Sequence, residues 1–372
     1  MIRVGITGQA GFVGTHLYNF LNLHKTEIQT IPFRDDFFQT AKELVNFVSQ
    51  CDTIVHCAAM NRHPDPDIIY KTNIDLIKKL ISAITSAGTK PHLLFSSSTQ
   101  EALDNPYGKS KREGRILLEK FARDAGAAFT GLVIPNVFGP FGVPFYNSVI
   151  ATFCHQLTHS QVPKIDVDKS VKLIYVHDLV SIILSCILKR ENAGEFLVPP
   201  TMDKKVSDIL MQLTLYKDNY LGSGIFPSLD SAFDVALFNT FRSYMDHKTV
   251  FPVQLKRNSD QRGDFVETIK SGCGGQVSFS TTRPGITRGN HFHTRKVERF
   301  AVIKGTARIQ LRRIGTSEVL DFFLSGDKPA YVDMPVWYTH NIKNTGSDEL
   351  FTLFWINELF NPENPDTFFE NI

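Results

Sequence analysis

Short apolar runs alternate with longer segments of helical periodicity in the first half of the chain. Four of these runs are typical of buried parallel strands: residues 2–6, 53–56, 92–95 and 131–134. Between them, apolar residues recur at helical spacing, most clearly over 72–87 and 109–125. This alternation predicts βαβ units that wind a parallel sheet and cover both of its faces.

The pattern changes after about residue 245. Short strands separated by glycine, proline and aspartate turns follow, over residues 276–280, 300–303, 307–311 and 350–354. This spacing predicts an all-β sandwich or barrel. We therefore expect two domains, residues 1–245 and 246–372, which suits a chain of 372 residues at about 150 residues per domain.

Composition and charge argue against several classes of protein. Lys plus Arg number 40 and Asp plus Glu 38, so the formal charge of +2 gives no field that would gather nucleic acid. The five cysteines are widely spaced and form no CxxC pair, which favours a reducing cytoplasm over a disulfide framework. The longest apolar stretch, 179–188, is about half of a membrane span, so we expect no membrane insertion.

The first predicted strand ends in a glycine-rich turn that opens a helix. Gly8, Gly11 and Gly14 have GxxGxxG spacing, with Phe12 and Val13 between the last two. Glycines let the backbone turn tightly and approach a pyrophosphate, and the free N–H groups of a helix start favour phosphate. The turn therefore predicts a Rossmann-like dinucleotide site that includes these five residues.

The end of the second predicted strand bears on the choice of dinucleotide. Arg34 suits the 2′-phosphate of NADP, whereas the adjacent Asp35 suits the ribose hydroxyl of NAD. We favour NADPH, bound in part by Arg34. A solvated loop charge is the structural alternative for this arginine.

A serine, a tyrosine and a lysine form the candidate catalytic group. Tyr107 and Lys111 lie four residues apart, so on a helix they share one face. Lys111 would lower the pKa of the tyrosine and hold the nicotinamide ribose, while Tyr107 exchanges the proton that accompanies hydride transfer. Ser98 ends a strand at the sheet edge where open α/β sheets bind ligands. Together with the glycine turn, these residues predict a reductase.

Three histidines and a glutamate mark the second half of the chain. Residues 285–305 read G-x5-HxH-x4-E-x6-G, which singles out His291, His293 and Glu298, and His340 follows later. Residues two apart on a strand share a face, and Glu298 is expected on the neighbouring strand. Three imidazoles and a carboxylate suit Zn²⁺ or a similar first-row ion. Buried histidines without a metal are the structural alternative.

The first 240 residues resemble the extended short-chain dehydrogenase/reductase family of nucleotide-sugar enzymes. The resemblance rests on the glycine turn, the Tyr107–Lys111 pair and the segments 52–59, 72–74, 135–140 and 176–180. It implies that Ser98, with Ser97 as a near neighbour, binds the reacting carbonyl and that Asn136 faces the substrate. Only eight residues separate Ser98 from Tyr107, fewer than is usual in that family.

The histidine pattern resembles the cupin family, which implies a jelly-roll barrel. The segments 260–267 and 288–291 are also similar to the sugar-nucleotide 3,5-epimerase branch of cupins. By that resemblance Arg262 and Arg288 hold the nucleotide diphosphate, and His291 acts as a metal-free base. We favour a metal-ligand role for His291, because the other three residues complete a coordination set.

Taken together, the two halves resemble the CapF-type bifunctional enzymes of capsular polysaccharide synthesis. The resemblance implies that the cupin epimerises C3 of a UDP-activated 4-keto-6-deoxy amino sugar. The reductase domain then reduces the C4 ketone with NADPH to a UDP-2-acetamido-2,6-dideoxy-L-talose, a precursor of N-acetyl-L-fucosamine. Tyr338 is expected to bind substrate, and Tyr338, Lys296 and Asp333 are candidates for moving the C3 proton.

Two other readings stay open at this point. In one, the cupin is only a metal-stabilised binding or dimerisation module attached to a reductase. In the other, the chain is a non-catalytic sensor of sugar nucleotides. A homodimer is expected in either case, because cupins and extended reductases often pair.

Overall fold

The computed structural model describes residues 1–372, which divide into two compact units. The first unit contains Met1–Val149 and Val167–Val206, and the second contains Ile150–Asp166 and Ser207–Ile372. Residue 245 lies inside the second unit. The expected division of the chain into a reductase domain, residues 1–245, and a second domain, residues 246–372, stays a prediction.

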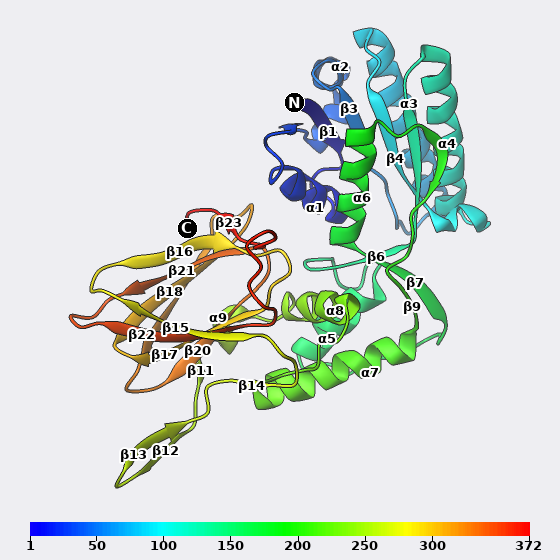
Figure 1. The fold of residues 1–372 in the computed structure, drawn as a ribbon. Coiled ribbons are helices and arrows are strands. Elements are labelled where there is room, and N and C mark those ends of the chain that lie inside the picture. The colour runs from blue at the N-terminus through cyan, green and yellow to red at the C-terminus, as the bar shows by residue number, and fades with distance from the viewer. The chain divides into compact units, whose positions relative to one another are not determined.

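A six-stranded parallel sheet forms the centre of the first unit. Its order is β2 (Ile28–Ile31), β1 (Ile2–Thr7), β3 (Thr53–His56), β4 (His92–Ser98), β5 (Phe129–Ile134) and β8 (Ala193–Leu197) (Figure 1). The chain reverses direction across the sheet between β1 and β3, which is where doubly wound sheets bind their ligands. The prediction of a Rossmann-like parallel sheet is confirmed.

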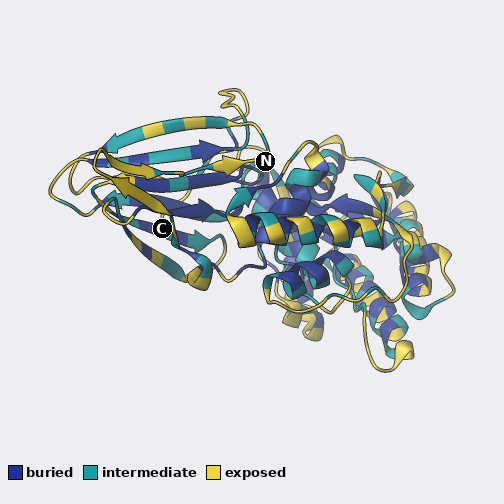
Figure 2. Cartoon of the chain, turned by 90° about the horizontal axis from the view of Figure 1, so that it is seen from below, coloured by how far each residue is buried: buried dark blue, intermediate teal, exposed yellow.

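Helices cover both faces of this sheet. One face packs on α1 (Phe12–Leu21) and α6 (Val176–Lys189), and the other on α2 (Ala41–Ser49), α3 (Pro66–Ala87) and α4 (Pro106–Ala125). Strands β3 and β5 are buried along their whole length because both faces of the sheet are covered, whereas helix α4 has one buried and one exposed side (Figure 2). Fully burying one leucine or valine in such a core contributes about 1.5–3 kcal/mol.

A smaller sheet and short helical turns complete the first unit. The sheet joins β6 (Asn136–Phe138), β7 (Ser170–Tyr175) and β9 (Met202–Lys205), with β6 and β7 parallel. The turns are η1 (Asp35–Gln39) and η2 (Thr99–Ala102). No helix in the chain is long and apolar enough to cross a membrane.

Two five-stranded antiparallel sheets dominate the second unit. One has the order β11 (Val253–Gln254), β20 (Ala330–Met334), β17 (Glu298–Lys304), β22 (Leu350–Ile356) and β15 (Gln276–Thr282). The other has the order β19 (Val319–Ser325), β18 (Thr306–Arg313), β21 (Tyr338–Asn344), β16 (Thr287–Phe292) and β23 (Phe368–Phe369). The all-β prediction is confirmed, but the strands form two open sheets and no closed barrel is found.

The placement of Glu298 differs from its prediction. It begins β17, which follows β16 in the chain but belongs to the other sheet. Glu298 is therefore not on a neighbouring strand of the histidine sheet, because the connection after His293 crosses from one sheet to the other. Glu298 follows His293 by five residues, which fits both a tight hairpin within one sheet and a crossing between two sheets. The sequence alone therefore did not distinguish these two connections.

Several helices and two small ribbons accompany the sheets of the second unit. The helices are α5 (Val149–Thr158), α7 (Val206–Tyr216), η3 (Lys217–Leu221), α8 (Ala232–Arg242) and α9 (His247–Val250). One ribbon pairs β10 (Ile225–Phe226) with β14 (Lys270–Ser271). The other is a hairpin of β12 (Arg257–Asp260) and β13 (Gly263–Val266), which projects from the sheets in Figure 1.

Candidate functional site

The glycine turn lies at the carboxyl end of β1 and requires its glycines. Gly8 has φ +69°, and a Cβ there would come within 2.7 Å of the backbone of Ala58. A Cβ on Gly14 would overlap the carbonyl oxygen of Gly8. Gly11 is the N-cap of α1 without a side-chain cap, and the first turn carries no acidic residue. Its N–H groups, starting with those of Phe12 and Val13, therefore suit an anionic group such as a pyrophosphate.

Arg34 follows β2 and is exposed at its carboxyl end. Its Nη2 lies 2.9 Å from the carboxylate of Asp36. Gln9 of the glycine turn accepts a hydrogen bond from the N–H of Phe33 at 3.2 Å, which fixes the strand end beside the turn. This position suits the adenosine end of a dinucleotide, and the choice of NADP over NAD stays a prediction.

Tyr107 and Lys111 lie in the first turns of α4, which Asn105 caps through the N–H of Gly108. Lys111 is buried, donates from Nζ to the carbonyl of Ser96 at 2.7 Å and lies 5.7 Å from the centre of the Tyr107 ring. Burial lowers the pKa of Lys111 to about 8 and raises the pKa of Tyr107 to about 12. Tyr107 thus keeps its proton at neutral pH, as a proton donor to a ketone must.

The three serines at the end of β4 have different surroundings. Ser96 donates to the carbonyl of His56 at 3.0 Å, and the buried Ser97 donates to the carboxylate of Glu101. Ser98 accepts from the N–H of Gln100 at 3.2 Å and donates to no protein atom. Because side chains alternate along a strand, Ser97 points to the opposite face from Ser96 and Ser98. Ser96 already donates its proton to the carbonyl of His56, so Ser98 is the serine whose hydroxyl proton is available to a substrate.

A buried ion pair that sequence reasoning missed holds the connection between Ser98 and Tyr107. Glu101 of η2 accepts from Arg115 of α4, with Nε at 3.0 Å and Nη2 at 2.9 Å. The two side chains are 10% and 13% exposed. Nothing in the spacing of a glutamate and an arginine fourteen residues apart identifies such a pair. It ties the short connection to the helix that carries the tyrosine.

Asn136 opens β6 and is exposed. Its Nδ2 donates to the carbonyl of Lys172 at 3.1 Å, which leaves its amide oxygen without a protein donor. The expected contact with substrate stays a prediction. Asn73, by contrast, exchanges two hydrogen bonds with the backbone of Met60 and a third with Ser110, so its role is structural.

The four predicted metal ligands lie together between the two sheets of the second unit. One donor atom from each of His291, His293, Glu298 and His340 falls within 4.8 Å of the others. Glu298 Oε2 lies 3.2 Å from Nε2 of His293 and 3.3 Å from Nε2 of His340. The sequence prediction of the cluster therefore agrees with the geometry.

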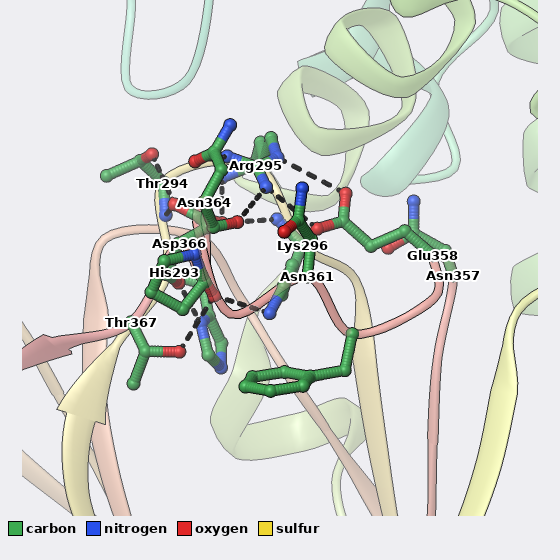
Figure 3. A network of polar contacts seen from close by, with 12 residues as sticks. His293, Thr294, Arg295, Lys296, Asn357, Glu358, Asn361, Asn364, Asp366 and Thr367 are labelled. Carbon is green, nitrogen blue, oxygen red and sulfur yellow. Dashed lines mark hydrogen bonds and ion pairs between the residues drawn. The ribbon is translucent and has the colours of Figure 1, made fainter.

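Hydrogen bonds behind the cluster orient two of its imidazoles. His293 Nδ1 lies 2.5 Å from the carbonyl oxygen of Asp366, and His340 Nδ1 lies 3.2 Å from that of Tyr338 (Figure 3 for His293). Because a carbonyl only accepts, both Nδ1 atoms carry the proton and both Nε2 atoms turn toward Glu298. The buried His340 Nε2 has no hydrogen-bond partner of suitable geometry. This arrangement fits a metal ion.

The ionisation of His291 and Glu298 suits a cation as well. Burial opposes a charge on His293, but the hydrogen bond and charge of Glu298 outweigh it and raise the pKa of His293, so this ring releases a proton when it binds a metal. Burial, followed by the charges of the other two histidines, lowers the pKa of His291 to about 3, so this ligand is neutral. Burial alone would favour the protonated acid of Glu298, but the interactions of its carboxylate with the rings of His293 and His340 outweigh that and hold its pKa well below the usual range. Neutral imidazole and ionised carboxylate are the forms that bind metals.

The three predicted substrate residues of the second unit lie in different places. Arg262 is in the turn of the β12–β13 hairpin, which projects away from the two sheets in Figure 1, and it pairs with Asp260 at 2.6 Å. Arg288 is exposed on β16. Tyr338 begins β21, is half-buried and meets the ring of His247 edge-on at 5.3 Å. Burial raises the pKa of Tyr338. The structure of one chain thus does not bring Arg262 to the histidine cluster.

Two of the proton-transfer candidates are engaged elsewhere. Lys296 Nζ donates to the carbonyl of Pro365 at 2.5 Å. Asp333 is fully buried, accepts from Arg299 at 2.7 Å and accepts from the hydroxyl of Tyr220 at 2.6 Å.

Comparison with known proteins assigns the two halves separately. Residues 4–198 match the model of the NAD dependent epimerase/dehydratase family, and residues 258–368 match the polysaccharide biosynthesis C-terminal domain. The chain belongs to the NAD dependent epimerase/dehydratase family. Membership of this family supports a nicotinamide cofactor at the glycine turn.

Relatives of this family member extend over the whole chain. A Pseudomonas aeruginosa protein named UDP-2-acetamido-2,6-beta-L-arabino-hexul-4-ose reductase is 35% identical over 99% of this chain and 98% of its own length. The crystal structure of the capsular polysaccharide assembling protein CapF from Staphylococcus aureus is 34% identical, covers both chains fully and gives a TM-score of 0.64. The resemblance to CapF-type enzymes is confirmed.

A more distant structure agrees on the fold alone. RMD from Pseudomonas aeruginosa, solved with NADPH, is 23% identical over 59% of this chain and 83% of that chain, with a TM-score of 0.52. It adds support for the dinucleotide-binding architecture of the family and carries no assignment of substrate.

Proposed function

We propose that the chain is a bifunctional nucleotide-sugar enzyme of surface polysaccharide synthesis. Its first unit reduces the C4 ketone of a UDP-2-acetamido-2,6-dideoxy-4-hexulose with NADPH, and its second unit epimerises C3 of that sugar. The observation that carries the proposal is the buried Lys111 beside Tyr107 at the carboxyl edge of a parallel sheet. The full-length relative named as a UDP-sugar 4-keto reductase supports the substrate class.

The residues of the first unit take defined parts in the reduction. NADPH, when bound, supplies the hydride. Tyr107 donates a proton to the carbonyl oxygen, and the positive charge of Lys111 stabilises the tyrosinate that remains. Ser98 donates a hydrogen bond to the same oxygen and fixes the carbonyl for attack. Arg34 holds the 2′-phosphate of the cofactor, and Asn136 faces the sugar.

The residues of the second unit serve the epimerisation. A C3 proton is acidic because it lies next to the C4 ketone, and a Zn²⁺ ion held by His291, His293, Glu298 and His340 would stabilise negative charge on the ketone oxygen. Tyr338 is the residue that we propose moves the proton. Arg288 binds the diphosphate, and Arg262 does so from the hairpin of the second copy in a homodimer, since its own chain does not bring it to the cluster. The jelly-roll topology of cupins is part of this proposal, as is a homodimer.

A second candidate function keeps the reductase and makes the β unit a binding module. It is favoured by the engagement of Lys296 and Asp333 in contacts with the protein itself, which leaves few free bases near the cluster. In this case the product of reduction would keep the C3 configuration of the substrate.

Solvent isotope exchange tests the two candidates. The UDP-4-keto sugar is incubated with enzyme in deuterated water without NADPH, and C3 is examined by NMR and mass spectrometry. Deuterium at C3 that disappears in a His340→Ala variant supports the epimerase. If no deuterium enters C3 although NADPH is still oxidised, the binding-module candidate replaces it. If NADPH is not oxidised with any UDP-4-keto sugar, the reductase assignment fails.

A further inference from the structure

We propose that Asp366 is a positioning residue for the metal ligand His293, and that residues 364–369 are a built part of the metal site. The proposal deepens the proposed function and rests on its metal site. Asp366 is seventy-three residues from His293 in the sequence and belongs to no recognised pattern. Its backbone and its side chain act in different ways on the loop that carries the histidine.

The backbone carbonyl of Asp366 fixes the orientation of the His293 ring. It accepts the Nδ1 proton at 2.5 Å, and Nε2 then lies 3.2 Å from Glu298 (Figure 3). A ring that rotated away from this acceptor would leave a buried N–H without a partner. The contact therefore sets both the tautomer and the direction of the ligand nitrogen.

The carboxylate of Asp366 holds the loop that follows His293. One oxygen accepts from the N–H of Thr294 at 3.0 Å and from its hydroxyl at 2.7 Å. The other accepts from the N–H groups of Arg295 and Lys296, both at 3.0 Å. Four donors thus converge on one carboxylate that is 3% exposed. The loop cannot shift without breaking several charge-assisted hydrogen bonds at once.

The same segment also pairs with the strand that carries His291, the first histidine of the HxH pair. Strand β23 pairs with β16 so that Phe369 lies opposite His291 and Phe368 lies opposite Phe292. Between the two contacts, Asp366 itself has φ +43°, in the left-handed region that asparagine and aspartate tolerate best. The segment 364–369 therefore contacts the backbone or ring of two of the four ligands.

Zinc affinity measured by competition with a chromogenic chelator tests the proposal. Asp366→Asn keeps the left-handed tolerance but replaces one acceptor oxygen by an NH₂ group that faces N–H donors. We expect about 10–100-fold weaker zinc binding, as for other groups that orient metal ligands. Thr294→Val removes one donor only and is expected to weaken binding less. Glu358→Gln removes the ion pair of Arg295 on the same loop and is the matched control.

Cobalt substitution supplies a readout that a general loss of stability does not move. The visible absorption of bound Co²⁺ reports ligand geometry, and we expect it to change in Asp366→Asn but not in Glu358→Gln. Equal zinc affinity and an unchanged cobalt spectrum in Asp366→Asn and Thr294→Val would overturn the positioning role and leave the metal site intact. Wild-type protein that binds neither ion would overturn the metal site and the positioning role together, while the reductase assignment stands on NADPH oxidation.

Discussion

Burial is the largest cause of the shifted pKa values of Lys111 and Tyr107, the proposed catalytic pair. Neither side chain has a carboxylate partner, and Lys111 is enclosed by Phe95 and Tyr107. Loss of hydration favours the neutral form of both groups, so the lysine becomes easier to deprotonate and the tyrosine harder. The sequence predicted the pair from its spacing, but it predicted a lowered pKa for the tyrosine, whereas burial raises the pKa of Tyr107.

The lowered pKa of Lys111 predicts an alkaline limit for reduction. Its folded value of about 8 lies below the ordinary lysine value, so the side chain is charged below about pH 8 and neutral above it. We expect kcat/KM for NADPH oxidation to fall as the pH rises through this value, because neutral lysine no longer stabilises tyrosinate. A pH–rate profile measures it; a rate that stays flat well into the alkaline range contradicts the role of the charge.

Substitution of Tyr107 tests the proton donor directly. Tyr107→Phe keeps the ring beside Lys111 and removes the hydroxyl, so we expect reduction to slow by about 10²–10⁴-fold. Binding of NADPH, followed by fluorescence titration, is expected to persist, as is deuterium exchange at C3. Loss of exchange together with reduction would argue against two separate reaction sites.

Among the elements, η2 lies in the short connection between Ser98 and the helix α4 that carries Tyr107. Only eight residues separate Ser98 from Tyr107, and a single helical turn joined to α4 by Glu101 and Arg115 spans them. A Cβ on Gly108 would overlap the carbonyl of Gln100, so the helix start and the turn are in direct contact. The sequence shows the shortness but not the ion pair that compensates for it.

Breaking this ion pair is expected to be costly. Glu101→Gln removes the buried partner of Arg115 and leaves it only the half-exposed Glu195 at 3.3 Å. We expect the free energy of unfolding to fall by about 1.5–3 kcal/mol, the range for a hydrogen bond to a charged group. Urea unfolding measures the change. The double variant Glu101→Gln, Arg115→Met is expected to recover part of the loss, because no unpaired charge remains.

Glu113, an exposed glutamate of the helix α4 that carries Arg115, serves as the control. Glu113 bonds the hydroxyl of Tyr70 at an exposed position, so Glu113→Gln is expected to change stability by less than about 1 kcal/mol. If Glu101→Gln and Glu113→Gln behave alike, the buried pair does not hold the connection.

Taken as a whole, the molecule was easier to predict in its first unit than in its second. Parallel strands buried on both faces give continuous apolar runs, and the glycine turn, the tyrosine and the lysine follow at fixed offsets. In the second unit, alternation predicted strands but not which sheet each strand joins. Glu298 was therefore assigned to the wrong sheet, although its membership of the cluster was predicted.

Contacts between segments that are far apart in the sequence could not be predicted from local patterns of residues. Asp366 and Glu101 act through tertiary contacts, and no local periodicity marks them. Arg262 was grouped with the histidines by resemblance, yet the hairpin places it away from them within one chain.

Metal binding is expected to stabilise the protein as well as to serve the reaction. Zinc at about 100 times its Kd would add about 2.7 kcal/mol to the free energy of unfolding, because the four ligands converge only in the folded state. Thermal unfolding with and without a chelator measures this stabilisation. His340→Ala is expected to melt at the same temperature in both conditions, and a zinc effect that survives this substitution would place the ion elsewhere.

Glu298 reaches the histidines from the opposite sheet, so the distance between its carboxylate and the imidazoles depends on how closely the two sheets pack. Any substitution in the apolar layer between the sheets that pries them apart by a fraction of an ångström would separate the carboxylate from the imidazoles. Such a variant would lose the metal ion although all four ligand residues are still present. A packing defect in the core would then be mistaken for the loss of a catalytic residue.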